Sequence, residues 1–160
     1  MQTVHDVHDP VKWEGNLRYV AGKHGLKWTI TLATLPTASE QEVFEQVARH
    51  LLTQGAVCHV GADCAYRGEA GACAAGALMS DNDAATLSRY NTGYGWARLT
   101  DEGRVPVQHR EFVRELQRLH DSENPSQWRT SLGLIARARH LDASFIDREF
   151  PVSVPETTAA

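Results

Sequence analysis

The sequence predicts a single α+β domain that is mainly helical and carries a small antiparallel sheet. Long segments repeat apolar residues at helical spacing, residues 27–35 alternate apolar and polar side chains, and a glycine-containing stretch at 56–78 is typical of short extended pieces. With 160 residues, one domain can bury about two thirds of its unfolded surface. The predicted organisation is a helix-plus-strand element at 1–37, a main domain at 38–150 and a flexible tail at 151–160.

The first segment, His5 to Leu26, is predicted to contain a helix. Asp9 suits its N-cap, Pro10 suits its first turn, and Gly25 suits the position just after its last residue. These three signals together mark both ends of the helix.

A predicted strand follows at 27–35. Trp28, Ile30 and Leu32 alternate with polar residues, and Pro36 ends the segment. This half-buried strand is expected to form the sheet together with the cysteine hairpin.

The next predicted helix begins at Ser39, which forms a capping box with Glu42, and stops at Gly55. Its inward face consists of apolar residues at helical spacing, namely Val43, Phe44, Val47, Leu51 and Leu52.

The middle of the chain predicts the rest of the sheet. Short strands are expected at 56–60, 64–67 and 73–78, and a tight turn at Gly68 and Gly71 joins the last two into a cysteine hairpin.

Helices dominate the remainder. A short helix is predicted at 81–90, a structured glycine- and aromatic-rich loop at 91–103, and an antiparallel helical hairpin from a helix at 108–120, a turn at 121–124 and a helix opening at Pro125. The inward residues of the hairpin are Phe112, Val113, Leu116 and Leu119 in its first helix and Trp128, Leu132, Ile135 and Ala136 in its second.

The chain also contains an internal repeat. Seven residues recur at a constant offset of 115 positions: His5, Asp6, Pro10, Trp13, Leu17, Ala21 and Leu26 match His120, Asp121, Pro125, Trp128, Leu132, Ala136 and Leu141. We interpret the two copies as the same turn-plus-helix, each with its tryptophan in the core. The alternative is that the two His-Asp pairs bind a metal, but such a site needs further ligands.

Composition narrows the classes of function. The net charge of −4 gives no bulk attraction to nucleic acid or to an anionic membrane, and no apolar run is long enough to span a bilayer. Three cysteines without a secretion signal predict reduced thiols in the cytoplasm. No cofactor is expected, and no pattern indicates a small-molecule ligand.

Four segments carry a resemblance to a known family. They are the helix at 42–55, Cys64-Ala-Tyr-Arg-Gly, Cys73-Ala-Ala-Gly-Ala-Leu-Met-Ser-Asp, and Leu116-Gln-Arg-Leu-His-Asp followed by Pro125, Trp128, Leu132, Ile135 and Ala136. On these segments, residues 39–146 resemble a family of small uncharacterised bacteriophage and prophage proteins. Cys58 departs from the family pattern, where a serine is expected, and the first 37 residues precede the family's usual start.

The resemblance implies a cytoplasmic, phage-linked protein, and phage accessory proteins of this size often bind and block host machinery. Together with the absence of an assembled catalytic set and the aromatic- and arginine-containing loop at 90–98, it favours a protein that binds and inhibits a host protein, such as a component of an antiviral defence system (an anti-CRISPR-like role), over an enzyme. The expected contact surface combines aromatic and arginine side chains of the types that dominate protein interfaces. These side chains are Tyr66, Arg67, Tyr94, Trp96 and Arg98.

A small cysteine- or zinc-dependent enzyme centred on Cys64 and Cys73 is the first alternative. With Cys58 and His59 these residues supply zinc-ligand types, although no Cys-x2-Cys pair is present. In a thiol enzyme, Arg67 would lower the pKa of a nearby thiol. The base would be one of three histidines, namely His59, His109 or His120. The structural alternative is that Cys64 and Cys73 are small buried core residues without a chemical role.

A DNA-binding regulator is the second alternative. Arg110, Arg114 and Arg118 fall four residues apart and form a stripe on one helix. Glu111 and Glu115 alternate with this stripe, which is the usual pattern of a solvated face and argues against a nucleic-acid partner.

Overall fold

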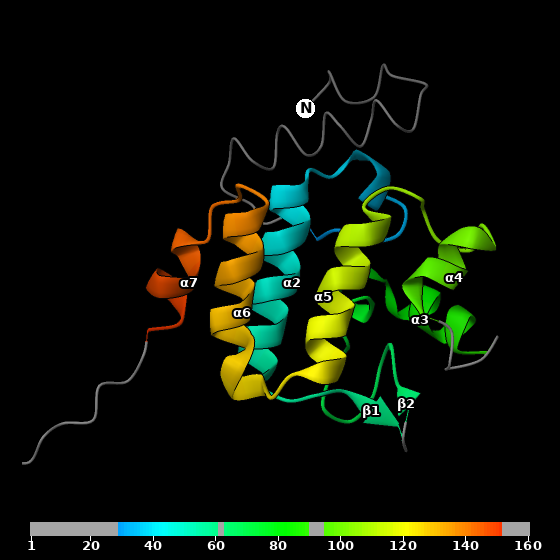
Figure 1. Cartoon of the computed structure of the whole chain (residues 1–160). Coiled ribbons are helices and arrows are strands. Elements are labelled where there is room, and N and C mark those ends of the chain that lie inside the picture. The colour runs from blue at the N-terminus through cyan, green and yellow to red at the C-terminus, as the bar shows by residue number, and fades with distance from the viewer. Residues whose placement is uncertain (1–28, 61–62, 90–94, 152–160) are drawn as a thin grey trace, which may run out of the picture.

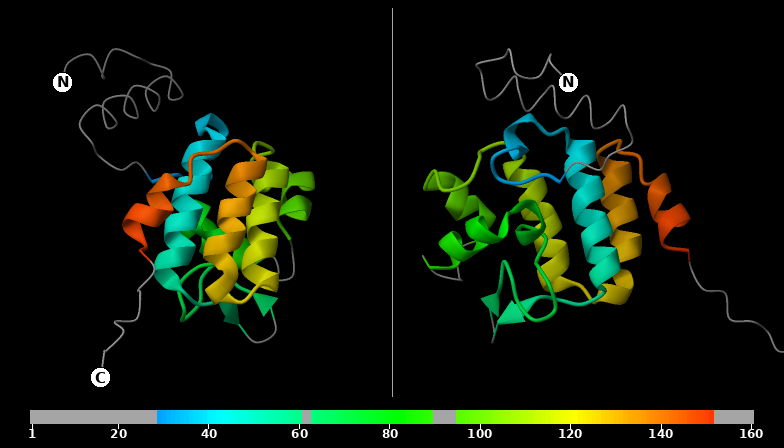
Figure 2. Two further views of the ribbon diagram at one scale, coloured as in Figure 1. Left: turned by 60° about the vertical axis from the view of Figure 1, so that its left-hand side comes forward. Right: turned by 180° about the vertical axis from the view of Figure 1, so that it is seen from behind.

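The computed structural model describes residues 29–60, 63–89 and 95–151. Three long helices lie side by side at its centre (Figure 1): α2 (Glu40–Gln54), α5 (Arg110–Ser122) and α6 (Pro125–Ala138). The shorter helices flank this group (Figure 2): α7 (Ser144–Glu149) lies on one side, and α3 (Asp81–Ser88) and α4 (Trp96–Asp101) lie on the other.

The predicted central helices are confirmed. The Ser39–Glu42 capping box opens α2, and Gly55, with a φ of 61°, ends it. Asn124 caps α6, whose first residue is Pro125. The buried faces follow the predicted spacing: Val43, Phe44, Val47 and Leu51 in α2, Phe112, Val113, Leu116 and Leu119 in α5, and Trp128, Leu132 and Ala136 in α6.

The α+β class is wrong, because the described residues are mainly helical and contain no sheet that forms a layer. The only strand pairing among them joins β1 (His59–Val60) to β2 (Asp63–Cys64), two residues each. This pairing is too short to cover a face of the core.

In the described part of the predicted strand, residues 29–35, the chain instead forms a turn followed by a short 3-10 helix, η2 (Leu35–Thr37). The side-chain amide of Gln46 provides the hydrogen bonds that a neighbouring strand would have made. It accepts from the Ile30 N–H at 2.6 Å and donates to the Ile30 carbonyl at 2.7 Å. Thr34 then bonds the Thr31 N–H at 2.9 Å and turns the chain toward Pro36.

The predicted cysteine hairpin is also wrong, because Cys64 pairs with His59 of β1 and not with the Cys73 segment. Cys73 begins helical turns instead of a strand: the Ala77 N–H donates to its carbonyl at 2.9 Å, and η3 (Gly76–Leu78) follows. Alanine-rich sequence without β-branched residues favours this outcome. The predicted tight turn is present, because Gly68 and Gly71 exchange two backbone hydrogen bonds at 2.9 and 3.0 Å.

Further differences concern the short helices. Residues 96–101 form α4 where a loop was expected, and α7 was not predicted. The first hairpin helix begins at Arg110, because His109 has a left-handed φ of 60°, and extends through Ser122. The hairpin turn is therefore shorter than the predicted 121–124.

The C-terminal copy of the repeat corresponds to α6 together with the end of α5. Its repeated residues Trp128, Leu132 and Ala136 are fully buried. His140 has a φ of 57° just after the helix, and the Leu141 N–H donates to the Ala136 carbonyl at 2.9 Å. This is a Schellman C-cap. The N-terminal copy lies outside the described residues, as do positions 152–160 of the predicted tail.

One apolar core spans the described segments. Ile30 and Leu35, on the N-terminal side of the predicted boundary at 37, belong to the same buried cluster as Phe44 and Phe145. None of the helices in the described ranges combines the length and hydropathy required to cross a bilayer.

Candidate functional site

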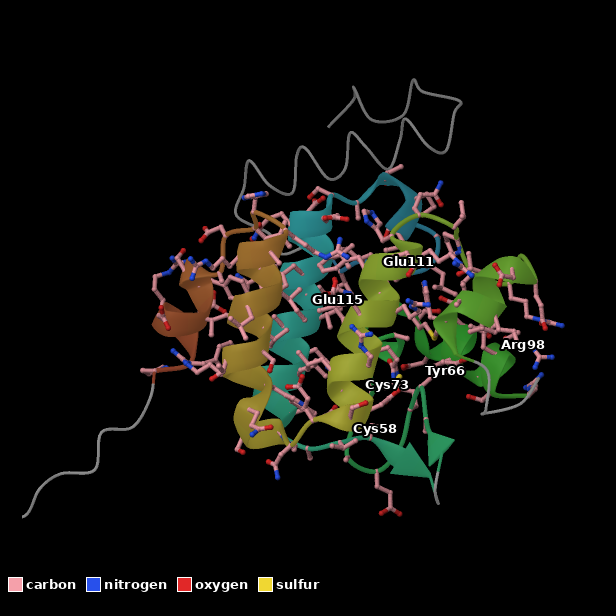
Figure 3. The ribbon with its side chains drawn as sticks, in the orientation of Figure 1. Cys58, Tyr66, Cys73, Arg98, Glu111 and Glu115 are labelled. Carbon is pink, nitrogen blue, oxygen red and sulfur yellow. The ribbon has the colours of Figure 1, made fainter. Side chains whose placement is uncertain are left out.

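The two cysteines whose side chains are described are buried beside the lower end of α5 (Figure 3). Cys58 is 0% exposed and Cys73 is 1% exposed. The Cys73 Sγ accepts the Gly76 N–H at 3.3 Å, and the Cys58 thiol donates to the Gly71 carbonyl at 3.4 Å. Both thiols thus bond to nearby backbone. The Cys64 side chain lies outside the described residues.

A zinc site finds no support in this part of the chain. No group of three or more His, Cys, Asp or Glu side chains comes together among the described residues. Cys58 and Cys73 therefore have no further described ligands with which to build a tetrahedral site.

His120 is completely buried, and its ring makes directed contacts to Cys58, Asp121 and Trp128 among the described residues. Its Nε2 lies 3.0 Å from the Cys58 backbone nitrogen, and its Nδ1 lies 2.9 Å from Asp121 Oδ1. Its ring stacks on Trp128 with a centroid separation of 5.5 Å and an interplanar angle of 29°. Because a backbone N–H can only donate, Nε2 must accept, and Nδ1 therefore carries the proton and donates to Asp121.

Cys58, His120 and Asp121 are the residue types of a thiol enzyme, but their arrangement serves packing. The Nε2 lone pair that would accept a proton from a thiol receives the Cys58 N–H instead. Cys58 and His120 are also 0% exposed, so no substrate reaches them. The sequence indicated His120 as a possible base but gave no signal for this pairing, which joins residues 62 positions apart.

The predicted contact surface does not form a single exposed patch. Trp96 is 2% exposed and Tyr66 is 7% exposed, so the expectation that they contribute exposed aromatic surface is wrong. Tyr94 lies outside the described residues. Arg98 is 58% exposed on α4 at the edge of the molecule (Figure 3) and pairs with Glu102 at 3.0 Å.

Arg67 organises the chain around it. Its guanidinium donates to the carbonyls of Tyr66, Gly76 and Met79 at 3.1, 2.5 and 2.7 Å, and it pairs with Asp81 at 3.1 Å. A Cβ at Gly76 would lie 2.1 Å from the Tyr66 carbonyl oxygen, so the close approach requires glycine. Arg67 therefore holds η3 and the start of α3 in place.

The predicted arginine stripe is largely neutralised by carboxylates. Arg110 binds Asp101 at 2.9 Å and Glu111 at 2.9 Å, and Arg114 binds Glu111 at 3.1 Å. Only Arg118 of the three has no ion pair among the described residues. A row of cations available to phosphates is therefore not present on α5.

A shallow groove between α5 and α6 is the feature that the sequence-based prediction missed. It has a volume of about 310 Å³, and its lining includes Arg118, Leu119, Ser122, Ser131, Leu134 and Ile135. Leu134 is 62% exposed. The sequence contained one signal for this exposure, namely the position of Leu134. It falls beside the inward stripe of its helix, which already contains Leu132 and Ile135.

Two carboxylates outside the groove have lowered pKa values. Hydrogen bonds from Arg104 and then Arg98 lower the pKa of Glu102. The backbone N–H of Ser144 lowers the pKa of Asp142, which precedes α7. Both arrangements stabilise the ends of short helices.

Comparisons of the chain with protein-family models, with curated proteins and with solved structures found no match, so no family is assigned and the phage resemblance stays a prediction.

Proposed function

We propose that this chain is a non-enzymatic protein that acts by binding another protein through the groove between α5 and α6. The observation that carries the proposal is Leu134, a large apolar side chain that is 62% exposed in this groove. Exposed apolar area beside charged groups is typical of interfaces, which combine an apolar centre with a polar rim.

The chemistry elsewhere favours binding over catalysis. The His120 ring is fully used by its contacts to Cys58 and Asp121, and the Cys73 sulfur accepts a backbone N–H. Of the residues named for the cysteine-enzyme alternative, Cys73 and His120 are therefore both occupied and buried.

The expected partner class comes from the resemblance to phage proteins. On that basis we propose a host protein in the cytoplasm, such as a component of an antiviral defence system, as the molecule that the chain inhibits. The contact residues proposed from the sequence are replaced by the groove, since Tyr66 and Trp96 are buried.

The test is capture of partners from bacterial lysate by the tagged full-length chain, its Leu134→Asp variant and its Val107→Asp variant. Val107 is the matched control, because it is 66% exposed but does not line the groove. We expect one stoichiometric protein that is retained by the Val107 variant and lost by the Leu134 variant. Capture that is equal for all three chains would place binding elsewhere, and an empty capture would remove the support for a host partner.

A further inference from the structure

Each repeated residue of the C-terminal copy makes a structural contact. The three that belong to the apolar face of α6 are fully buried, namely Trp128, Leu132 and Ala136. The His120 ring stacks on Trp128 and bonds to Asp121. Pro125 is the first residue of α6, and Leu141 closes the helix with a backbone hydrogen bond into its last turn. The repeated positions are therefore those that cap α6 or hold it against the core.

Residues 5–26 carry the same side chains at the same spacing, although this segment lies outside the described residues. The match extends to the helix ends. Asp9 corresponds to the N-cap Asn124, and both residue types are favoured at that position. Gly25 corresponds to His140, whose left-handed φ of 57° glycine adopts more readily. Each chain thus has two segments suited to one binding surface, the surface of α2 and α5 on which α6 packs; we call it the α6 seat.

Positions outside the repeat favour α6 as the occupant of its own seat. Arg129 pairs with Asp147 of α7, and the residue that corresponds to Arg129 is Glu14, which would repel that carboxylate. Arg139 pairs with carboxylates of both α2 and α5, whereas the corresponding residue is His24. The N-terminal copy can therefore supply the buried contacts of α6 but not its ion pairs.

Two glutamines of α2 show how far the N-terminal copy can reach in its own chain. Gln41 bonds both backbone groups of Asp142, which corresponds to residue 27. Gln46 bonds both backbone groups of Ile30. Seated in its own chain, the copy would have to bring residue 27 to Gln41 without detaching Ile30.

The connection is too short for this. Five residues of helix separate the two glutamines by about 7.5 Å along the axis and about 140° around it. A path of that kind over a helix about 10–12 Å wide is about 14–17 Å long, whereas the chain from residue 27 to residue 30 spans at most about 11 Å. A linker that cannot span two sites contributes no effective concentration. The N-terminal copy of a second chain has no such restriction.

We propose that residues 5–26 of one copy occupy the α6 seat of a second copy when α6 leaves it. Such an exchange of equivalent elements joins two chains without a new surface. In the intact chain α6 holds the seat, because it is tethered beside it and makes the additional ion pairs. Exchange becomes dominant when α6 is weakened. The seat lies on the buried side of α6 and the groove with Leu134 lies on its exposed side, so the exchange is independent of the proposed function.

Removal of the tryptophan from each copy tests the exchange in the full-length chain. Trp128→Ala weakens α6 by leaving a cavity in its core contact, whereas Trp13 of other copies remains available to fill the seat. The double variant Trp13→Ala/Trp128→Ala removes this possibility. Trp96→Ala is the matched control, because Trp96 is 2% exposed in α4 and has no counterpart in the repeat.

The measurements are urea unfolding followed by circular dichroism, and sedimentation equilibrium, both from roughly 1 to 100 μM, where micromolar dissociation constants are measurable. We expect the urea midpoint of Trp128→Ala to rise with concentration, because association stabilises the folded state, and its dimers or longer assemblies to appear over the same range. Wild type, Trp13→Ala and Trp96→Ala should keep a constant midpoint and remain monomeric. The double variant should show no rise, and at the highest concentration its midpoint should fall by more than the two single changes together.

Equal midpoints of Trp128→Ala and the double variant would overturn the exchange, because Trp13 would then not fill the seat. A Trp128→Ala chain that stays unfolded at every concentration would overturn it for the same reason. Association that persists in the double variant would place the contact elsewhere. An advantage of Trp128→Ala over the double variant that does not depend on concentration would assign the seat to the N-terminal copy of the same chain and exclude a second copy.

Discussion

Replacement of His120 by its two amide analogues should separate the contributions of its two ring nitrogens. A glutamine side chain places an amide group near the position of Nε2 and can accept the Cys58 N–H, whereas an asparagine places its amide near Nδ1 and retains the contact with Asp121. The two contacts differ in access to water. Cys58 is fully buried, but the Asp121 side chain is 37% exposed.

The expected costs follow from this difference. His120→Asn removes the acceptor of a buried N–H, which costs about 1–3 kcal/mol. It also leaves space beside the Trp128 ring, which lies 5.5 Å from the imidazole. His120→Gln loses the ring stacking but keeps the acceptor. We therefore expect His120→Asn to be less stable than His120→Gln by at least about 1 kcal/mol, out of a total of about 5–15 kcal/mol for a domain.

Urea unfolding at pH 7, followed by tryptophan fluorescence, measures both changes. Asp121→Asn is the control, because it leaves an acceptor for the Nδ1 proton and should cost less than either His120 variant. Equal stability of the glutamine and asparagine variants would refute the argument that the Cys58 hydrogen bond dominates. A reversed order would show that the Asp121 contact matters more.

Three further predictions follow from other contacts. Arg67→Ala should destabilise the fold by about 2–4 kcal/mol in urea unfolding, since one guanidinium donates to several carbonyls. Arg67→Lys should recover less than half of that loss, because an ammonium group lacks the planar fork of donors. Complete recovery by lysine would contradict the role given to the guanidinium. The folded-state pKa of Asp142 is lowered by the Ser144 N–H, so its contribution is present above the ordinary aspartate pKa of 3.8 and lost as the pH falls through the lower folded value. Thermal melts should therefore show Asp142→Asn less stable than wild type at pH 7 and equally stable at the acid end, and a pH-independent difference would exclude this linkage. In native buffer, a thiol reagent should titrate at most one of the three cysteines, because Cys58 and Cys73 are buried; rapid reaction of two or three thiols would revive the cysteine-enzyme alternative.

The long helices could be predicted from sequence because local signals and packing agree. Ser39 and Gly55 mark the ends of α2, and Trp128, Leu132 and Ala136 recur at the spacing of a buried helical face. In these segments each residue that favours a helix also favours the observed packing.

The sheet could not be predicted correctly, because tertiary contacts replace the expected pairing. Alternation around Ile30 is a valid strand signal, but Gln46, 16 positions away, satisfies both backbone groups of Ile30 from a helix. The Cys73 segment follows the helical preference of alanine instead of the extended conformation expected between glycines. The Gln46 contact lies outside any local window of sequence, whereas the helical turns at Cys73 follow a local preference that the glycine pattern concealed.

The contact surface predicted from the sequence was wrong for a related reason. Residue type identifies side chains that can form an interface, but it does not show which of them are buried in the core. Trp96 and Tyr66 are buried, and Arg67 binds local carbonyls. Leu134 is a leucine on an amphipathic helix, a residue that is usually buried. Its exposure becomes apparent only from the positions of the neighbouring helices.

The links between α2 and the last helix have a consequence for synthesis of the protein. Arg49 in α2 pairs with Glu149, 100 positions later, and Gln41 bonds the backbone of Asp142, 101 positions later. The apolar face of α2 is therefore translated long before α5, α6 and α7 exist to cover it. Contacts this distant in sequence form late, so the native core closes only after nearly the whole chain has left the ribosome. A premature stop before α6 would leave the Phe44 face of α2 open to aggregation and proteolysis.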